Sequence, residues 1–185
     1  MKKVIFVFAI VFLAVSFTAM AQVQIFGKYS EGSVTPDINV FGYGPKLDSS
    51  GKFRMIYFTL FEQNWAEGII GVNYSPKSWI EFGLGIGMEQ NPALYRLTAN
   101  IWMGKDKLSF FTWVEKGDGR DNYWYKSVLG YAITPKFTAE LIAWRFNGVG
   151  ISPKLKYDHF SVWVFPGYDF ESQKKNLTVG VDIKI

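Results

Sequence analysis

His159, Ser161 and Glu171 are the residues whose types and spacing come closest to a catalytic arrangement. Residues i and i+2 of a β-strand share one face, so His159 and Ser161 would lie side by side on a strand. A histidine in that position can deprotonate the serine hydroxyl, and a carboxylate such as Glu171 can orient the imidazole ring. The strand predicted over 159–168, however, turns both side chains inward and leaves Glu171 in a loop. We therefore expect a histidine of the lumen or rim that takes part in no reaction.

The rest of the chain offers little that could hold a cofactor. Gly83, Gly85 and Gly87 are spaced like part of a nucleotide-binding loop, but they alternate with apolar residues as in a strand, and no helix follows. His159 is the single histidine and cysteine is absent, which excludes a multi-histidine metal site and a cysteine nucleophile. The formal net charge of +4 is too small to favour nucleic acid as a partner. We expect no enzyme activity, no metal and no cofactor.

Residues 1–21 have the pattern of a secretory signal peptide. A cationic start is followed by an apolar run over 4–15, and 19–21 supplies the small-x-small pattern before a cut at Gln22. The alternative is an N-terminal membrane anchor, but a spanning helix needs roughly 20 apolar residues. We predict that the protein leaves the cytoplasm and that residues 22–185 form one domain.

The segment 79–89 alternates strictly between apolar and polar or small residues. One face carries Ile80, Phe82, Leu84, Ile86 and Met88. The other face carries Glu81, Gly83, Gly85, Gly87 and Glu89. A period of two over this length is a strand signal that a helix cannot produce. Three glycines and two glutamates suit a polar lumen, so we expect the five apolar residues to contact lipid.

Segments of similar length recur along the chain between short clusters of turn-forming residues. We predict twelve strands, near 22–29, 37–43, 53–62, 65–75, 79–89, 93–103, 107–116, 123–133, 137–146, 149–157, 159–168 and 177–185. Proline removes a ladder donor, so Pro153 leaves open that 149–157 is a loop and that the strands number ten. The connections have no room for crossover helices, which predicts an antiparallel, meandering sheet.

The composition of the connections alternates along the chain. Three turns carry lysine, at 75–78, 104–107 and 134–136, whereas the turns between them carry Glu, Gln, Asn or Gly, at 62–64, 89–92 and 116–122. Alternate turns of an up-and-down barrel lie at the same end. The division therefore favours that topology.

Together, the leader, the ten-residue alternating strands and the Ser/Thr-Pro-Lys turns resemble small bacterial outer-membrane β-barrels of the porin type. The resemblance implies an outer-membrane location with lipid as a partner, and belts of aromatic residues near strand ends. We assign to the belts Trp65, Tyr74, Trp79, Tyr95, Tyr123, Tyr125 and Tyr168. The chain departs from the usual aromatic C-terminus of such barrels at Ile185. The alternative is a soluble sandwich packed by these aromatics.

A second, narrower resemblance concerns His159-Phe160-Ser161, which is similar to the His-x-Ser motif of outer-membrane lipid A deacylases. The asparagine usual after that serine is replaced by Val162. A lipid-modifying enzyme is therefore the weakest of our functional hypotheses.

The faces opposite the apolar ones should point inward. As pore-lining residues we predict Glu81, Arg96, Lys126, Glu140, Lys154, Lys156 and Asp182. In one outcome water fills a narrow lumen, which twelve strands and the inward glycines would favour, and small hydrophilic solutes diffuse through it. In the other the charges pair across the barrel and close it, leaving a structural or adhesion protein whose loops at 30–36, 116–122 and 166–176 bind a partner. The sequence identifies neither the solute nor the oligomeric state.

Overall fold

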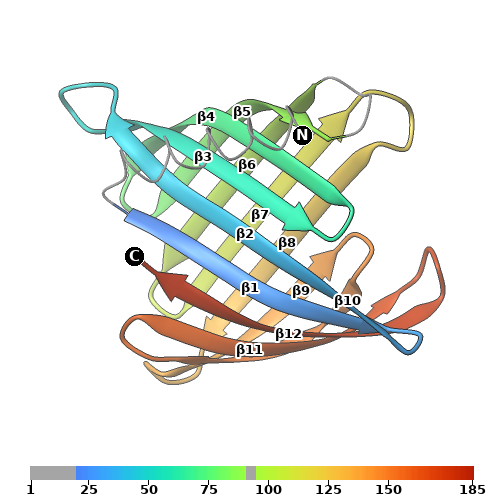
Figure 1. The fold of residues 1–185 in the computed structure, drawn as a ribbon. Helices are drawn as coiled ribbons and strands as arrows, with labels where there is room; N and C mark the ends of the chain where they lie inside the picture. Colours follow the sequence, from blue (N-terminus) through green and yellow to red (C-terminus); the bar gives the residue numbers. More distant parts are fainter. Residues whose placement is uncertain (1–19, 91–94) are drawn as a thin grey trace.

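The computed structural model describes residues 20–90 and 95–185, which form a closed antiparallel barrel (Figure 1). Each strand pairs with its neighbours in chain order, and β1 pairs with β12 to close the sheet. The strands are β1 (Met20–Ser30), β2 (Ser33–Lys46), β3 (Phe53–Glu62), β4 (Trp65–Lys77), β5 (Ile80–Glu89), β6 (Arg96–Lys105), β7 (Leu108–Gly117), β8 (Tyr123–Ala132), β9 (Phe137–Trp144), β10 (Gly148–Lys156), β11 (Phe160–Asp169) and β12 (Lys174–Lys184). The prediction of an up-and-down barrel of twelve strands is confirmed. Among the described residues no helix is long and apolar enough to cross a membrane.

Pro153 lies inside a regular strand, so the alternative of ten strands is wrong. It pairs with Ala139 of β9, and its neighbours continue that ladder without interruption. On the other side, β10 pairs with β11 at Val149 and again from Lys154 onward, with no paired residues between them. The missing N–H of proline therefore falls at a gap in a ladder, where it costs no hydrogen bond.

Two of the predicted loops are strand instead. The segment 33–36 belongs to β2, because Glu31 and Gly32 both adopt positive φ values (49° and 84°) and join β1 to β2 in a two-residue turn. Positive φ at both central residues is the geometry of a tight hairpin turn. The segment 166–176 is likewise mostly strand, with only 170–173 between β11 and β12. Neither forms the long loop that an adhesion surface would need.

The turns lie at two ends, as their composition predicts. The lysine-containing turns lie at the end where Ala21 and Ile185 exchange backbone hydrogen bonds, which we call the Ile185 end. The turns after β1, β3, β5, β7, β9 and β11 lie at the opposite end, which we call the Arg96 end.

The β2–β3 loop at the Ile185 end is ordered by the Asp48 carboxylate. It accepts hydrogen bonds from Ser50 Oγ and the Phe53 N–H, which hold the pKa of the Asp48 carboxyl below its usual value.

The outward face of the barrel is apolar. On β5, Phe82, Leu84, Ile86 and Met88 are 41–70% exposed, whereas Ile80 at the strand end is half-buried. Exposed apolar side chains occur on every one of the twelve strands. Such a surface requires a lipid environment, so the chain is a membrane-spanning barrel of the outer-membrane type.

Large apolar side chains fill much of the barrel's interior. One inward cluster contains Phe26, Ile142, Trp144, Trp163 and Phe165. A second contains Ile56, Phe58, Leu60, Ile69 and Trp113. Trp124 packs against both clusters. We call the layer formed by these residues the aromatic waist.

The inward glycines make room for neighbouring side chains rather than for solvent. A Cβ on Gly85 would lie 2.8 Å from Cγ2 of Thr98 and 3.0 Å from Cγ2 of Ile69. At Gly83 the same space is taken by the amides of Asn73 and Asn100. The expectation that these glycines widen the lumen is therefore wrong, because the adjacent strands' side chains lie over them.

Candidate functional site: two chambers inside the barrel

The barrel interior contains two chambers that meet at the aromatic waist. The chamber toward the Arg96 end has a volume of about 670 Å³, and the chamber toward the Ile185 end about 510 Å³. We call them the Arg96 chamber and the Lys126 chamber. Trp124 lines both, so it stands between them. Cavities of this size are typical of small-molecule sites.

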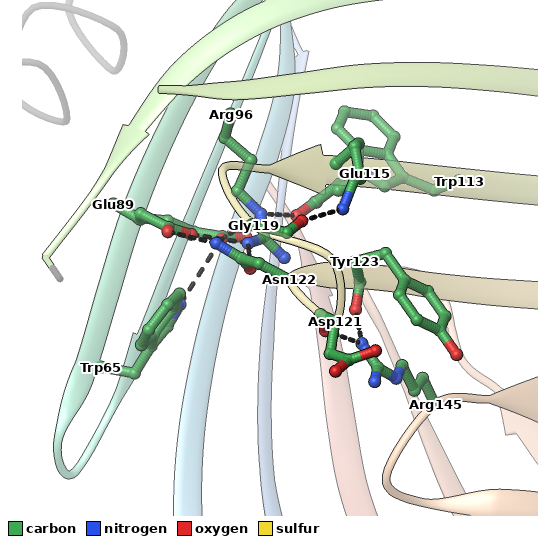
Figure 2. A network of polar contacts seen from close by, with 12 residues as sticks. Trp65, Glu89, Arg96, Trp113, Glu115, Gly119, Asp121, Asn122, Tyr123 and Arg145 are labelled. Carbon is green, nitrogen blue, oxygen red and sulfur yellow. Dashed lines mark hydrogen bonds and ion pairs between the residues drawn. The ribbon is translucent and has the colours of Figure 1, made fainter. Parts of the chain in front are cut away.

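Arg96 is the centre of a buried ion cluster in the Arg96 chamber (Figure 2). Its Nε lies 2.5 Å from Oε2 of Glu115 and 3.1 Å from Oε2 of Glu67, and its Nη1 lies 2.6 Å from Oε2 of Glu89. These side chains come from the four consecutive strands β4 to β7 and are at most 5% exposed. One guanidinium thus binds three carboxylates, and little of its charge is left for a passing ion.

Neutral groups complete this cluster. Asn122, from the loop between β7 and β8, accepts a hydrogen bond from Arg96 Nη1 at 2.8 Å and donates one to Glu89 Oε1 at 2.7 Å. The indole N–H of Trp113 donates to Glu115 at 2.6 Å. Trp65 does not belong to an outer belt as predicted. It shares the inward face with Glu67, donates to it at 3.4 Å, and lines the chamber.

A second arginine anchors the rim of the same chamber. Arg145 Nη1 donates to the backbone carbonyls of Asp121 and Tyr123, and its guanidinium lies 3.5 Å from the centre of the Tyr123 ring (Figure 2). Its Nε lies 3.7 Å from the carboxylate of Glu171. Arg145 therefore ties the β7–β8 loop to the turn after β9 and to the β11–β12 loop.

Asp182 organises the polar wall of the Lys126 chamber. It accepts hydrogen bonds from Gln24 (2.7 Å), Trp163 (2.9 Å) and Ser161 (3.1 Å), and Lys154 Nζ lies 2.6 Å from its second oxygen. Asp182 is 3% exposed, so its charge is satisfied within the wall. Lys154 also lies 3.6 Å from Glu140.

Lys126 differs from Arg96 and Lys154, which bind carboxylates. Its ammonium lies 3.8 Å from the centre of the Trp144 ring and 3.3 Å from Oε1 of Gln24. Within the described ranges no carboxylate lies within 4.0 Å of it, and two of its acidic neighbours, Asp182 and Glu140, bind Lys154 instead. In the β7–β8 ladder Lys126 pairs with Trp113, and in the β8–β9 ladder with Trp144. An ammonium on the inner wall is thus flanked by two indoles.

The remaining predicted lumen residues are dispersed. Glu81 lines the Lys126 chamber and accepts hydrogen bonds from Tyr43 (2.7 Å) and Asn73 (2.5 Å). Glu140 and Lys154 line the same chamber. Lys156 is exposed at the end of β10 and lines neither chamber. The structure therefore brings together Lys126, Lys154, Glu140 and Asp182, and it places Arg96 in a separate cluster.

The serine and histidine do not form a catalytic pair. Ser161 faces inward and donates its hydroxyl hydrogen bond to Asp182, while His159 lies in the turn before β11. Glu171 lies in the β11–β12 loop at the opposite end of the barrel, where it meets Arg145. Across the described ranges no group of three or more His, Asp or Glu residues could hold a metal ion.

Fold and site together define a bacterial outer-membrane type of β-barrel, whose outer face meets lipid and whose interior is divided by aromatic side chains. No protein-family model and no curated protein sequence matches this chain. Solved outer-membrane barrels have the same fold at low identity, and the class-level resemblance to porins is confirmed.

Three of these solved structures illustrate the range of that fold. The KdgM porin in complex with disordered oligogalacturonate is 14% identical, with a TM-score of 0.62, and the match covers 88% of this chain and 98% of that one. The NanC porin is 12% identical, with a TM-score of 0.54 and coverage of 88% and 100%. Outer membrane phospholipase A from Escherichia coli is 10% identical, with a TM-score of 0.59 and coverage of 94% and 96%. Porins and an enzyme thus share this fold.

Proposed function

We propose that this barrel is a pore of the outer membrane through which small hydrophilic solutes diffuse passively, without a reaction and without a cofactor. The observation that carries the proposal is the pair of chambers, one toward each end of the barrel, that share Trp124 as a wall. Polar and charged side chains line both, whereas the outer face is apolar. The likeness to the KdgM and NanC porins supports the same function.

The proposal includes the removal of residues 1–21 as a signal peptide. Most of that segment lies outside the described residues, while Met20 and Ala21 begin β1. Cleavage before Gln22 would shorten β1 by two residues and leave its pairing with β12 from Gln22 onward. N-terminal sequencing of the mature protein from the outer membrane tests this, and retention of residues 1–21 would contradict it.

Conductance across a planar lipid bilayer tests the pore itself. Refolded protein that migrates as a heat-modifiable band should give discrete channel steps. Trp124→Ala should raise the single-channel conductance, because it removes the side chain that separates the chambers. Leu129→Ala is the matched control, since Leu129 lies on the same strand but is 46% exposed on the outer face. Folded wild-type protein without channel steps would overturn the proposal.

One observation favours a second candidate, a closed structural barrel. The two apolar clusters of the aromatic waist meet at Trp124, between the chambers. If they block the lumen fully, the wild type would give no channel steps and Trp124→Ala would open it. Conductance of the wild-type protein therefore separates the two candidates.

A further inference from the structure

We propose that the Lys126 chamber is a binding site for an organic anion whose carboxylate is carried on a ring with an apolar face. The inference rests on the proposed pore and deepens it by naming the class of solute that pauses inside. It depends on three features of the chamber: a cation without an acidic partner, a continuous aromatic wall beside that cation, and a volume that holds a ring.

The cation is the ammonium of Lys126. It lies 3.8 Å from the centre of the Trp144 ring and 3.3 Å from the amide oxygen of Gln24, and it lines the chamber. Two of the carboxylates near it, Glu140 and Asp182, lie in salt bridges with Lys154, and among the described residues no carboxylate lies within 4.0 Å of it. A buried cation needs a counter-charge or water, so a solute carboxylate at this position would replace water and form a charge-assisted hydrogen bond.

The aromatic wall begins beside Lys126. Trp113 is its direct partner in the β7–β8 ladder, where facing side chains lie about 5 Å apart. The Trp113 ring lies 5.3 Å from that of Phe58 and 5.9 Å from that of Phe41, measured between ring centres. All three line the chamber. A flat solute bound through its carboxylate to Lys126 would therefore extend over aromatic rings.

The volume and the polar groups fit such a solute. About 510 Å³ is enough for a six-membered ring with its carboxylate and some water. Gln24, Asn39 and Asn100 add polar side chains to the lining of the chamber. Arg96 offers no equivalent site, because three carboxylates already bind its guanidinium.

The test measures binding and conduction separately on the same refolded protein. Isothermal titration calorimetry in detergent micelles, with empty micelles subtracted, compares sodium benzoate with sodium acetate. We expect saturable benzoate binding and much weaker acetate binding. Lys126→Met should weaken benzoate binding about tenfold or more, the effect of losing one hydrogen bond to a charged group. Phe41→Leu should weaken it about three- to tenfold while leaving acetate unchanged.

Lys107→Met is the matched control, because Lys107 is exposed in the turn between β6 and β7 and lines neither chamber. It removes the same charge and should leave benzoate binding unchanged. Absence of saturable benzoate binding, equal binding of acetate, or equal loss in Lys107→Met and Lys126→Met would overturn the inference. If Lys126→Met fails to fold, two measurements still test the binding site: the difference between benzoate and acetate binding in the wild type, and the weaker benzoate binding expected in Phe41→Leu.

Channel steps recorded in parallel keep the two proposals apart. A barrel that conducts but does not bind benzoate refutes the binding site and leaves the pore intact. A barrel that binds benzoate but gives no channel steps refutes the pore and leaves the binding site. In a conducting barrel, benzoate should also reduce the current through the wild type more than through Lys126→Met.

Discussion

The two chambers contain similar kinds of charged residue but use them differently. In the Arg96 chamber the guanidinium is surrounded by Glu67, Glu89 and Glu115, which hold four neighbouring strands together. In the Lys126 chamber the ammonium rests on an indole ring and has no carboxylate within 4.0 Å among the residues described. Charge that lines a lumen is therefore not all available to a solute, and only unpaired charge should determine selectivity.

The largest effect should come from Arg96→Met. The substitution leaves three carboxylates buried without their cation, and breaking a buried ion pair costs about 3–5 kcal/mol. We expect the free energy of unfolding, measured by urea titration in liposomes, to fall by about that amount.

Arg96→Lys keeps the positive charge but loses the planar guanidinium, which donates several hydrogen bonds at once. Its free energy of unfolding should therefore lie between those of the wild type and Arg96→Met. If Arg96→Met were as stable as the wild type, the cluster would not be structural, and the comparison between the chambers would lose its basis.

Substitutions on the lipid-facing surface give free energies of unfolding with which those of the interior variants can be compared. Leu84 is 70% exposed on the outer face of β5, and Leu84→Lys should cost roughly 2–4 kcal/mol at the bilayer midplane. Leu108→Lys, at the start of β7, should cost about 0–1 kcal/mol, because it lies near the interface. Urea titration in liposomes measures both. Equal costs at the two positions would contradict our assignment of the membrane-embedded band.

Lys126→Met should destabilise the barrel far less than Arg96→Met. The substitution mainly removes the cation–π interaction with Trp144, which contributes about 0.5–2 kcal/mol. Its larger effect should be on ion preference, because it removes a lumen cation that has no carboxylate within 4.0 Å among the described residues. We expect the reversal potential in a KCl gradient to shift toward cation selectivity. An unchanged reversal potential together with a large loss of stability would reverse the roles that we assign to the two chambers.

The smallest effect should come from Glu171→Gln at the rim of the Arg96 chamber. The Glu171 side chain is 61% exposed and its carboxylate lies 3.7 Å from Arg145, so the pair should contribute less than about 1 kcal/mol. High salt should remove even this difference in urea titrations. If Glu171→Gln lowered the free energy of unfolding as much as Arg96→Met does, the rim rather than the buried cluster would stabilise the Arg96 end of the barrel.

The fold was predictable because its signal is local. In β5 every second residue is apolar, and the same period with short turns recurs along the chain. The turn chemistry also placed alternate connections at opposite ends. The structure around Pro153 and over 33–36 was harder to predict. A gap in a ladder and a two-residue turn both depend on the strand that pairs with the segment, and the segment's own sequence does not show them.

The sites were less predictable because they depend on register. Glu67, Glu89, Arg96 and Glu115 meet only after four strands are paired, although each lies within two residues of a strand boundary at one end of the barrel. That shared position is the signal from which the cluster could have been found. The aromatic waist was hidden for another reason. In β3 both faces are apolar, so alternation cannot tell which residues turn inward.

The pairing of β1 with β12 has a consequence for assembly. These strands are far apart in the chain and next to one another in the wall (Figure 1), and they share eight paired positions from Gln22 to Tyr29. Until β12 arrives, β1 presents an unsatisfied row of N–H and C=O groups, which neither lipid nor a dry interior can satisfy. Insertion and closure should therefore be concerted late events, and a nascent chain stalled before β12 should need a chaperone to shield its open edge.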